Sequence, residues 1–228
     1  MRANPLEVFM KHVRVWRTLG FAILLSSMPL AEAATNNESW IFNGVTTNWA
    51  GGDLIVGLSG TNNSLQILNT GIVNNVSNGV IGSEASANAN WAEVKNTGSV
   101  WTVDILTIGN NGYNNTLTLS DGGYINSSYG YIGYGASASG NVVLVTGSDS
   151  WWQLGRLHIS TAGSGNRLRI RDSGWVTADH IVYGDSSAAG NEVWVSGADS
   201  QLSANGDLNA MYAAASHNRL IVSEGALL

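Results

Sequence analysis

Cysteine is absent from this 228-residue chain, proline occurs only twice, and charged residues make up 11% of it. Without cysteine the chain forms no disulfides and no cysteine metal sites, and thiol catalysis is excluded. The charged fraction is less than half of the roughly 25% in an average globular protein, so Ser, Thr, Asn and Gly must form most of the solvent-exposed surface. A hydrophobic fraction of 44% nevertheless excludes a disordered chain.

The N-terminus carries the one stretch that is both basic and strongly apolar. Residues 19–30 form the apolar part, and Ala31-Glu32-Ala33 gives the small-x-small pattern of a cleavage site. Four basic residues precede it: Arg2, Lys11, Arg14 and Arg17. About twelve apolar residues are too few to span a bilayer, which needs roughly twenty. The sequence therefore predicts a cleaved signal peptide at 1–33, starting at Met1 or Met10, and export of residues 34–228.

The chain beyond this leader is acidic. Removal of 1–33 takes four of the ten basic and two of the sixteen acidic residues, which leaves a net charge of −8. Nucleic acid and anionic lipid are therefore poor partners, and no further segment is apolar enough for stable membrane insertion. The one basic run is Arg167-Leu168-Arg169-Ile170-Arg171. Its alternation predicts the solvent face of a strand, with a small site for an anionic ligand as the alternative.

A unit of about fifty residues recurs four times and outweighs every single motif. Trp49, Trp101 and Trp152 mark the first three copies, and Leu202 takes their place in the weakened fourth. Each unit divides into two rungs of about 25 residues, because an alternating strand, a polar turn and a second alternating strand occur twice within it. Self-similarity at a fixed period is typical of an elongated, stacked fold.

Aligned rungs place apolar residues above one another in two columns. The first column holds the tryptophans: Trp49, Val73, Trp101, Ile125, Trp152, Val176, Leu202 and Leu228. The second holds mainly isoleucine: Val56, Ile81, Ile108, Ile132, Ile159 and Tyr183. Alternation within a rung and apolar identity between rungs predict an all-β parallel β-helix of about seven to eight rungs, with the tryptophans in its core.

A polar column marks one turn of each repeat: Asn69, Asp121, Asp172 and Glu224. Glycine follows two residues later in the first three copies, at Gly71, Gly123 and Gly174. Short polar side chains at such positions bond to their own backbone and open a turn. Calcium binding is the alternative, but the Gly-Gly-x-Gly-x-Asp nonapeptide that it needs is missing. We therefore expect neither a metal nor a cofactor.

Candidates for catalysis are few. Asp179 and His180 near Ser186 suggest a Ser-His-Asp arrangement, but Ser186 lies in a turn that recurs between rungs, which favours a structural role. A β-helix polysaccharide lyase or hydrolase is the alternative function, and it needs clustered acidic and basic residues. Asp172, Asp179 and Arg169 are its candidates, and all three follow the repeat. The sequence thus predicts a protein that is not an enzyme and has no catalytic, cofactor-binding or metal-binding residue.

Several segments resemble the repeats of bacterial autotransporter passenger domains. They are Gly147-Ser148-Asp149-Ser150-Trp151-Trp152, Leu117-Thr118-Leu119-Ser120-Asp121-Gly122-Gly123-Tyr124-Ile125 and Tyr131-Ile132-Gly133. The resemblance runs from about Trp49 to the C-terminus. It implies a right-handed parallel β-helix that is displayed on, or released from, a Gram-negative surface and serves adhesion or aggregation. It brings no catalytic residue with it.

The family continues into a C-terminal membrane β-barrel, whereas this repeat stops part-way through its last copy at Leu228. We therefore expect the N-terminal part of a passenger, truncated or fragmentary, or a non-functional remnant of such a gene. The expected function is an exported, non-enzymatic β-helix scaffold of adhesin type. Its expected partners are a host surface or a second copy, met through the faces or edges of the helix. Its expected location is the cell surface, the outer membrane or the medium as part of a complete autotransporter, and otherwise the periplasm.

Overall fold

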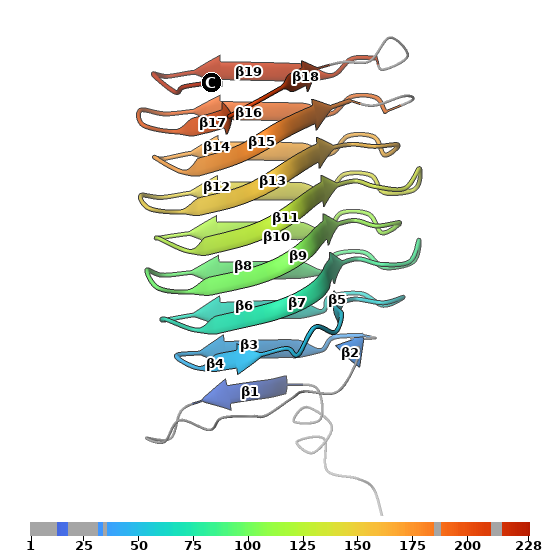
Figure 1. The fold of residues 1–228 in the computed structure, drawn as a ribbon. Coiled ribbons are helices and arrows are strands. Elements are labelled where there is room, and N and C mark those ends of the chain that lie inside the picture. Colours follow the sequence, from blue (N-terminus) through green and yellow to red (C-terminus); the bar gives the residue numbers. More distant parts are fainter. Residues whose placement is uncertain (1–12, 18–31, 34–35, 185–187, 211–215) are drawn as a thin grey trace, which may run out of the picture.

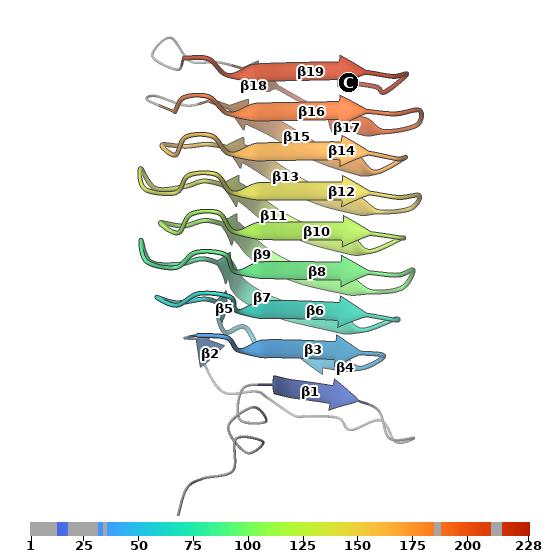
Figure 2. The ribbon, with the colours of Figure 1, turned by 180° about the vertical axis from the view of Figure 1, so that it is seen from behind.

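The structure is a computed structural model, and it describes residues 13–17, 32–33, 36–184, 188–210 and 216–228. These residues form strands and turns without a helix. The strands belong to two parallel sheets, A and B, which lie against each other and are seen from opposite sides in Figures 1 and 2. The predicted all-β parallel solenoid is confirmed, and seven turns of the coil combine a strand of sheet A with strands of sheet B.

Both sheets are stacked in the order of the chain. Sheet A contains nine short strands: β1 (Val13–Arg17), β3 (Ser39–Asn43), β6 (Ser64–Leu68), β8 (Trp91–Lys95), β10 (Thr116–Ser120), β12 (Val142–Thr146), β14 (Arg167–Arg171), β16 (Glu192–Ser196) and β19 (Arg219–Ser223). Sheet B contains ten: β2 (Glu32–Ala33), β4 (Thr46–Asn48), β5 (Leu54–Val56), β7 (Ile72–Ile81), β9 (Val100–Ile108), β11 (Tyr124–Ile132), β13 (Trp151–Ile159), β15 (Trp175–Tyr183), β17 (Gln201–Ala204) and β18 (Leu208–Ala210).

The chain winds through the sheets as a coil. From β3 to β16, each strand of sheet A leads through a tight turn to sheet B, and a longer loop returns to the next rung of sheet A (Figure 1). Followed from the N-terminal end, the coil is right-handed, as the resemblance to passenger domains implies (Figures 1 and 2). The right-handed twist of strands favours this hand for parallel crossovers.

The tight turns explain why the sequence repeats every two rungs. Three residues join β10 to β11, whereas four residues join β12 to β13. The same alternation recurs along the stack: 69–71, 96–99, 121–123, 147–150, 172–174 and 197–200. The longer turn places a buried serine inside, and Ser150 Oγ accepts a hydrogen bond from the N–H of Gly122 in the preceding rung, at 3.1 Å. The predicted polar turn column is confirmed, because Asn69, Asp121 and Asp172 open the shorter turns and Glu224 opens the last one. All four residues have a left-handed backbone, with φ of 50 to 56°.

The second predicted column is confirmed along its whole length. Val56 pairs with Ile81, and each later member pairs with the next as far as Tyr183. All six side chains are buried. Tyr183 reaches the backbone of sheet A, where its hydroxyl lies 2.5 Å from the carbonyl oxygen of Asn191 and accepts the N–H of Arg219 at 2.8 Å.

The first predicted column is confirmed from Val73 to Leu202 but is wrong at its start. Thr47 pairs with Val73, so Trp49 lies two residues beyond the column. The reason is a break in the first rung, where Ala50 and Gly51 adopt φ of 59° and 79° and separate β4 from β5. Trp49 is still core, with 2% of its surface exposed, because the displaced indole packs at 6.4 Å from the ring of Trp40.

A column of asparagines that we did not predict precedes most strands of sheet A. It consists of Asn63, Asn90, Asn115, Asn141, Asn166, Asn191 and Asn218, of which the first six are buried and Asn218 is half-buried. Within it, Oδ1 of Asn141 accepts the backbone N–H of Asn115 at 2.9 Å and the Nδ2 of Asn115 at 3.1 Å. The Nδ2 of Asn141 in turn donates to the carbonyl of Gly112 at 3.1 Å. This ladder satisfies loop backbone groups that burial would otherwise leave unpaired.

The predicted signal peptide lies mostly outside the described residues. Of 1–33 the structure describes 13–17 and 32–33, which form β1 and β2 beside β3 and β5. The cleavage of this segment stays a prediction.

Candidate binding groove on sheet A

The outer face of sheet A carries the basic run that the sequence singled out. On β14, Leu168 and Ile170 are buried in the core, whereas Arg167, Arg169 and Arg171 point outward. The predicted alternation is therefore confirmed. Beyond the leader the chain has six basic residues, and four of them lie on this face of β14 and β19. The four are Arg167, Arg169, Arg171 and Arg219.

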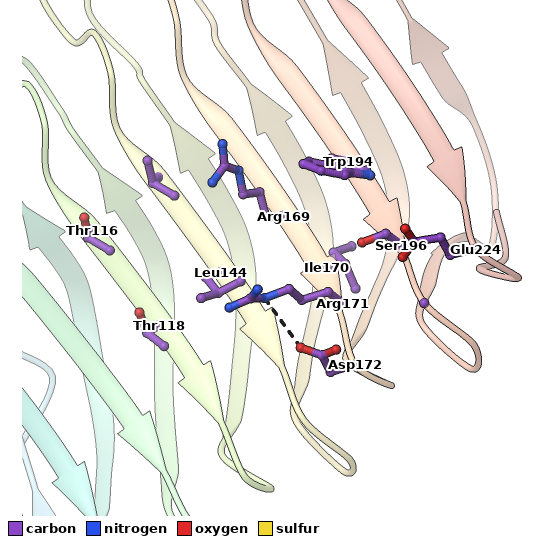
Figure 3. A pocket seen from close by; sticks show the side chains of 12 residues that line it. Thr116, Thr118, Leu144, Arg169, Ile170, Arg171, Asp172, Trp194, Ser196 and Glu224 are labelled. Carbon is purple, nitrogen blue, oxygen red and sulfur yellow. Dashed lines mark ion pairs between the residues drawn. The ribbon is translucent and has the colours of Figure 1, made fainter.

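A groove of about 390 Å³ crosses this face from β10 to the turn after β19 (Figure 3). Twelve residues line it: Thr116, Thr118, Val142, Leu144, Arg169, Ile170, Arg171, Asp172, Trp194, Ser196, Gly197 and Glu224. Thr118, Leu144, Arg169 and Trp194 stand at one level of the sheet, because each pairs with the next in register. The groove exists because threonine and short aliphatic side chains on β10 and β12 lie beside long side chains on β14 and β16.

The side chain of Arg171 reaches across to Leu144 on β12, whereas that of Arg169 lies farther toward the start of its strand (Figure 3). Arg171 pairs through Nε with the carboxylate of Asp172 at 3.5 Å, and the same carboxylate oxygen accepts the hydroxyl of Thr146 at 2.9 Å. Arg169 contacts Glu192 through Nη2 at 3.9 Å. Ion pairs that are this exposed to solvent contribute little to stability. Their effect here is to orient the two guanidinium groups.

Trp194 forms the other wall of the groove and is 38% exposed. Its Nε1 donates to Ser223 Oγ of the next rung at 3.2 Å, which fixes the ring over the sheet. An exposed indole held in this way offers a flat apolar surface beside cationic groups. The arrangement suits a ligand that combines an apolar face with hydrogen-bonding and anionic groups.

The outer face of sheet B carries a second depression, on the other side of the molecule. It lies at the bend of the long strands, and its lining includes Tyr129, Arg156, Asp179 and His180. Tyr129, Arg156 and His180 are neighbours in register. His180 Nδ1 contacts Asp207 at 3.5 Å, and Asp179 accepts a hydrogen bond from Asn205 Nδ2 at 3.2 Å.

These contacts give no support to the Ser-His-Asp arrangement. In the described residues the carboxylate beside His180 belongs to Asp207 and not to Asp179, and Ser186 lies outside the described residues. The candidates for a polysaccharide lyase are also separated. Arg169 and Asp172 line the groove on sheet A, whereas Asp179 lies in the depression on sheet B.

A cluster of three aromatic rings lies at the end of β11 and β13. His158 lies outward, as predicted, and its ring stacks on that of Tyr131 at 5.1 Å, while Tyr134 meets Tyr131 edge-on. Burial raises the pKa of the Tyr131 hydroxyl above its usual range, and the neighbouring Tyr134 and Tyr129 add to this effect. These rings form a packed cluster on the outer surface.

Among the described residues no three His, Cys, Asp or Glu side chains are placed to hold a metal ion. The same residues contain no helix with the length and apolar character that crossing a membrane requires. No protein-family model, curated protein or solved structure matches the chain.

Proposed function

We propose that this chain is an exported, non-enzymatic β-solenoid scaffold of the adhesin type, which presents the outer faces of its sheets to a host surface or to a second copy. Its place would be the cell surface or the medium as part of an autotransporter passenger. The proposal depends on the predicted leader and on the resemblance of the repeats to passenger domains.

One observation carries the proposal: the recurring residues serve the coil itself. The two apolar columns are buried between the sheets, and the recurring asparagines and turn serines bond to backbone of neighbouring rungs. Such a period stabilises a long surface without defining what that surface binds.

The outward positions behave differently, because their residues change from rung to rung. At the central outward position of sheet A, successive strands carry Thr118, Leu144, Arg169 and Trp194. These side chains are free of the packing requirement that keeps the columns alike. We therefore assign the binding function to the outward residues and the structural function to the repeat.

The test uses beads coated with the purified full chain. We expect coated beads to adhere to epithelial monolayers, or to clump with one another, more than albumin-coated beads of equal loading. Absence of both adhesion and clumping would count against the adhesin-type function.

A further inference from the structure

We propose that the groove on sheet A binds the anionic groups of an acidic polysaccharide. Arg169 and Arg171 hold its carboxylates or sulfates, while Leu144 and Trp194 contact the apolar faces of its sugar rings. The inference deepens the proposed function, on which it rests, by naming the ligand class of one outward face.

The arginines supply the anion site. Both arginines line the groove, and the guanidinium of Arg171 lies beside Leu144 of β12 (Figure 3). Nε of Arg169 is buried and has no hydrogen-bond partner among the described residues. Arg171 makes its ion pair with Asp172 through Nε, on the side of the turn. A planar guanidinium binds carboxylate or sulfate oxygens through parallel hydrogen bonds.

The rest of the groove fits a sugar. Val142 and Leu144 form a shallow apolar floor, Thr116 and Thr118 bring hydroxyl groups to one side, and Trp194 brings an exposed ring to the other. Sugar rings combine apolar C–H faces with equatorial hydroxyls, so they use both kinds of surface at once. The groove crosses β10, β12, β14 and β16, which places its ends roughly 14 Å apart at the usual strand spacing.

A peptide fits this surface less well. Extended peptides bind sheets by pairing with the free backbone of an edge strand. The strands under the groove have neighbours on both sides, since β12 pairs with β10 and β14, and β14 pairs with β12 and β16. Their backbone groups are therefore used, and the face offers side chains alone.

The groove lining is balanced in charge, although the chain as a whole is acidic. Arg169 and Arg171 stand against the carboxylates of Asp172 and Glu224. Glu192 is shared between Arg169 and Arg219, with contacts of 3.9 and 3.8 Å. Because both groove arginines are about half exposed, their contacts with an anionic ligand should weaken strongly with salt.

The experiment measures binding of the purified full chain to four polymers by biolayer interferometry. Polygalacturonate supplies carboxylates, dextran sulfate supplies sulfates, unmodified dextran is the neutral glycan, and poly-L-glutamate is the acidic peptide. We expect binding to polygalacturonate, to dextran sulfate or to both, and the preference names the anionic group. Each of R169Q and R171Q should weaken it about tenfold, since a charge-assisted hydrogen bond is lost.

Matched controls separate the site from general charge effects. R167Q removes one positive charge from β14, the strand that also carries Arg169 and Arg171, but Arg167 does not line the groove. R156Q removes one positive charge from β13 of sheet B. Both should bind nearly as well as the unaltered chain, and melting curves confirm that all variants fold. The proposal is overturned if R169Q/R171Q binds as well as R167Q, if dextran or poly-L-glutamate binds as tightly as the acidic glycans, or if no glycan binds. Adhesion that persists in R169Q/R171Q would reject this site while leaving the proposed function intact.

Discussion

Buried amides show at the level of single residues how this fold satisfies its backbone. From Asn90 to Asn191, each asparagine of the ladder bonds to the asparagine of the next rung and to a loop carbonyl, as Asn115 does with Asn141 and with Ala87. An amide suits this place because it donates and accepts at once. The side chain is therefore as fixed by the fold as the apolar columns are.

Replacement of Asn141 by alanine should destabilise the protein by about 3 kcal/mol, because the N–H and Nδ2 of Asn115 and the carbonyl of Gly112 lose their buried partner. Denaturant unfolding followed by circular dichroism measures the loss. Asn126, which is exposed on β11, provides the control, and its alanine variant should unfold like the unaltered chain. Equal stability of N141A and N126A would show that the ladder contributes nothing.

Tyr183 gives the fold a dependence on alkaline pH. Desolvation by burial, the largest effect, raises the pKa of its hydroxyl from 10.0 to about 12. The unfolded chain ionises this group first, so stability is complete below pH 10 and falls between pH 10 and about 12. Thermal melting at pH 9 and pH 11 measures the decrease. Y183F lacks the hydroxyl, so its melting temperature should fall less between pH 9 and pH 11 than that of the unaltered chain. An equal fall in both proteins would show that Tyr183 is not the source of the pH dependence.

At the scale of strands and turns, close contact between rungs fixes where glycine is needed. Gly123 ends a three-residue turn, and a Cβ built on it would lie 2.1 Å from the carbonyl oxygen of Val94 in the rung before. At Gly190 the backbone is left-handed, with φ of 64°, but a Cβ would meet nothing within 4 Å. The two positions thus separate the effect of a clash from that of backbone conformation.

We therefore expect Gly123→Ala to cost about 3 kcal/mol, as overpacking against a fixed backbone does. Gly190→Ala should cost only about 1–2 kcal/mol, the usual penalty of a left-handed conformation. Chemical unfolding of the two variants under the same conditions makes the comparison. A larger loss for Gly190→Ala would refute the packing of rung on rung.

The elements were predictable wherever the repeat was regular. Counting along the chain places Ile108 beside Ile132 correctly, because each rung buries the same face. It misplaces Trp49, because the break at Ala50 and Gly51 adds residues that no later copy contains. The asparagine ladder also recurs in the sequence every 25 to 27 residues. Polar residues at a fixed period suit exposed turns equally well, so the period alone does not reveal that these side chains are buried.

The groove was only partly predictable. Alternation identified the outward face of β14, and with it Arg169 and Arg171. Their neighbours Leu144 and Trp194 lie 25 residues away on either side, and only the register between rungs brings them together. The direction of the side chains, which brings Arg171 beside Leu144 of β12, follows from packing and not from spacing.

As a whole, the molecule is a stack in which each rung contacts only its neighbours. Stability in such a stack is distributed from rung to rung. The inward residues of β12 are buried, whereas on β19 Val222 is 40% exposed and Leu220 is half-buried. The rungs therefore differ in local stability.

Amide hydrogen exchange followed by mass spectrometry should reveal this gradient. We expect the amides of β19 to exchange at least about a hundredfold faster than those of β12, since local opening requires less energy where burial is incomplete. Uniform protection along the stack would indicate instead that the coil opens as one unit.

The central claim is that the repeat builds the coil while the outward residues of sheet A bind the partner. Bead adhesion measured side by side for the unaltered chain, R169Q/R171Q and R167Q tests it most directly. The account predicts that beads with the unaltered chain and with R167Q adhere alike, while those with R169Q/R171Q fall to the level of albumin. Equal adhesion of all three proteins, or adhesion of none, would contradict it.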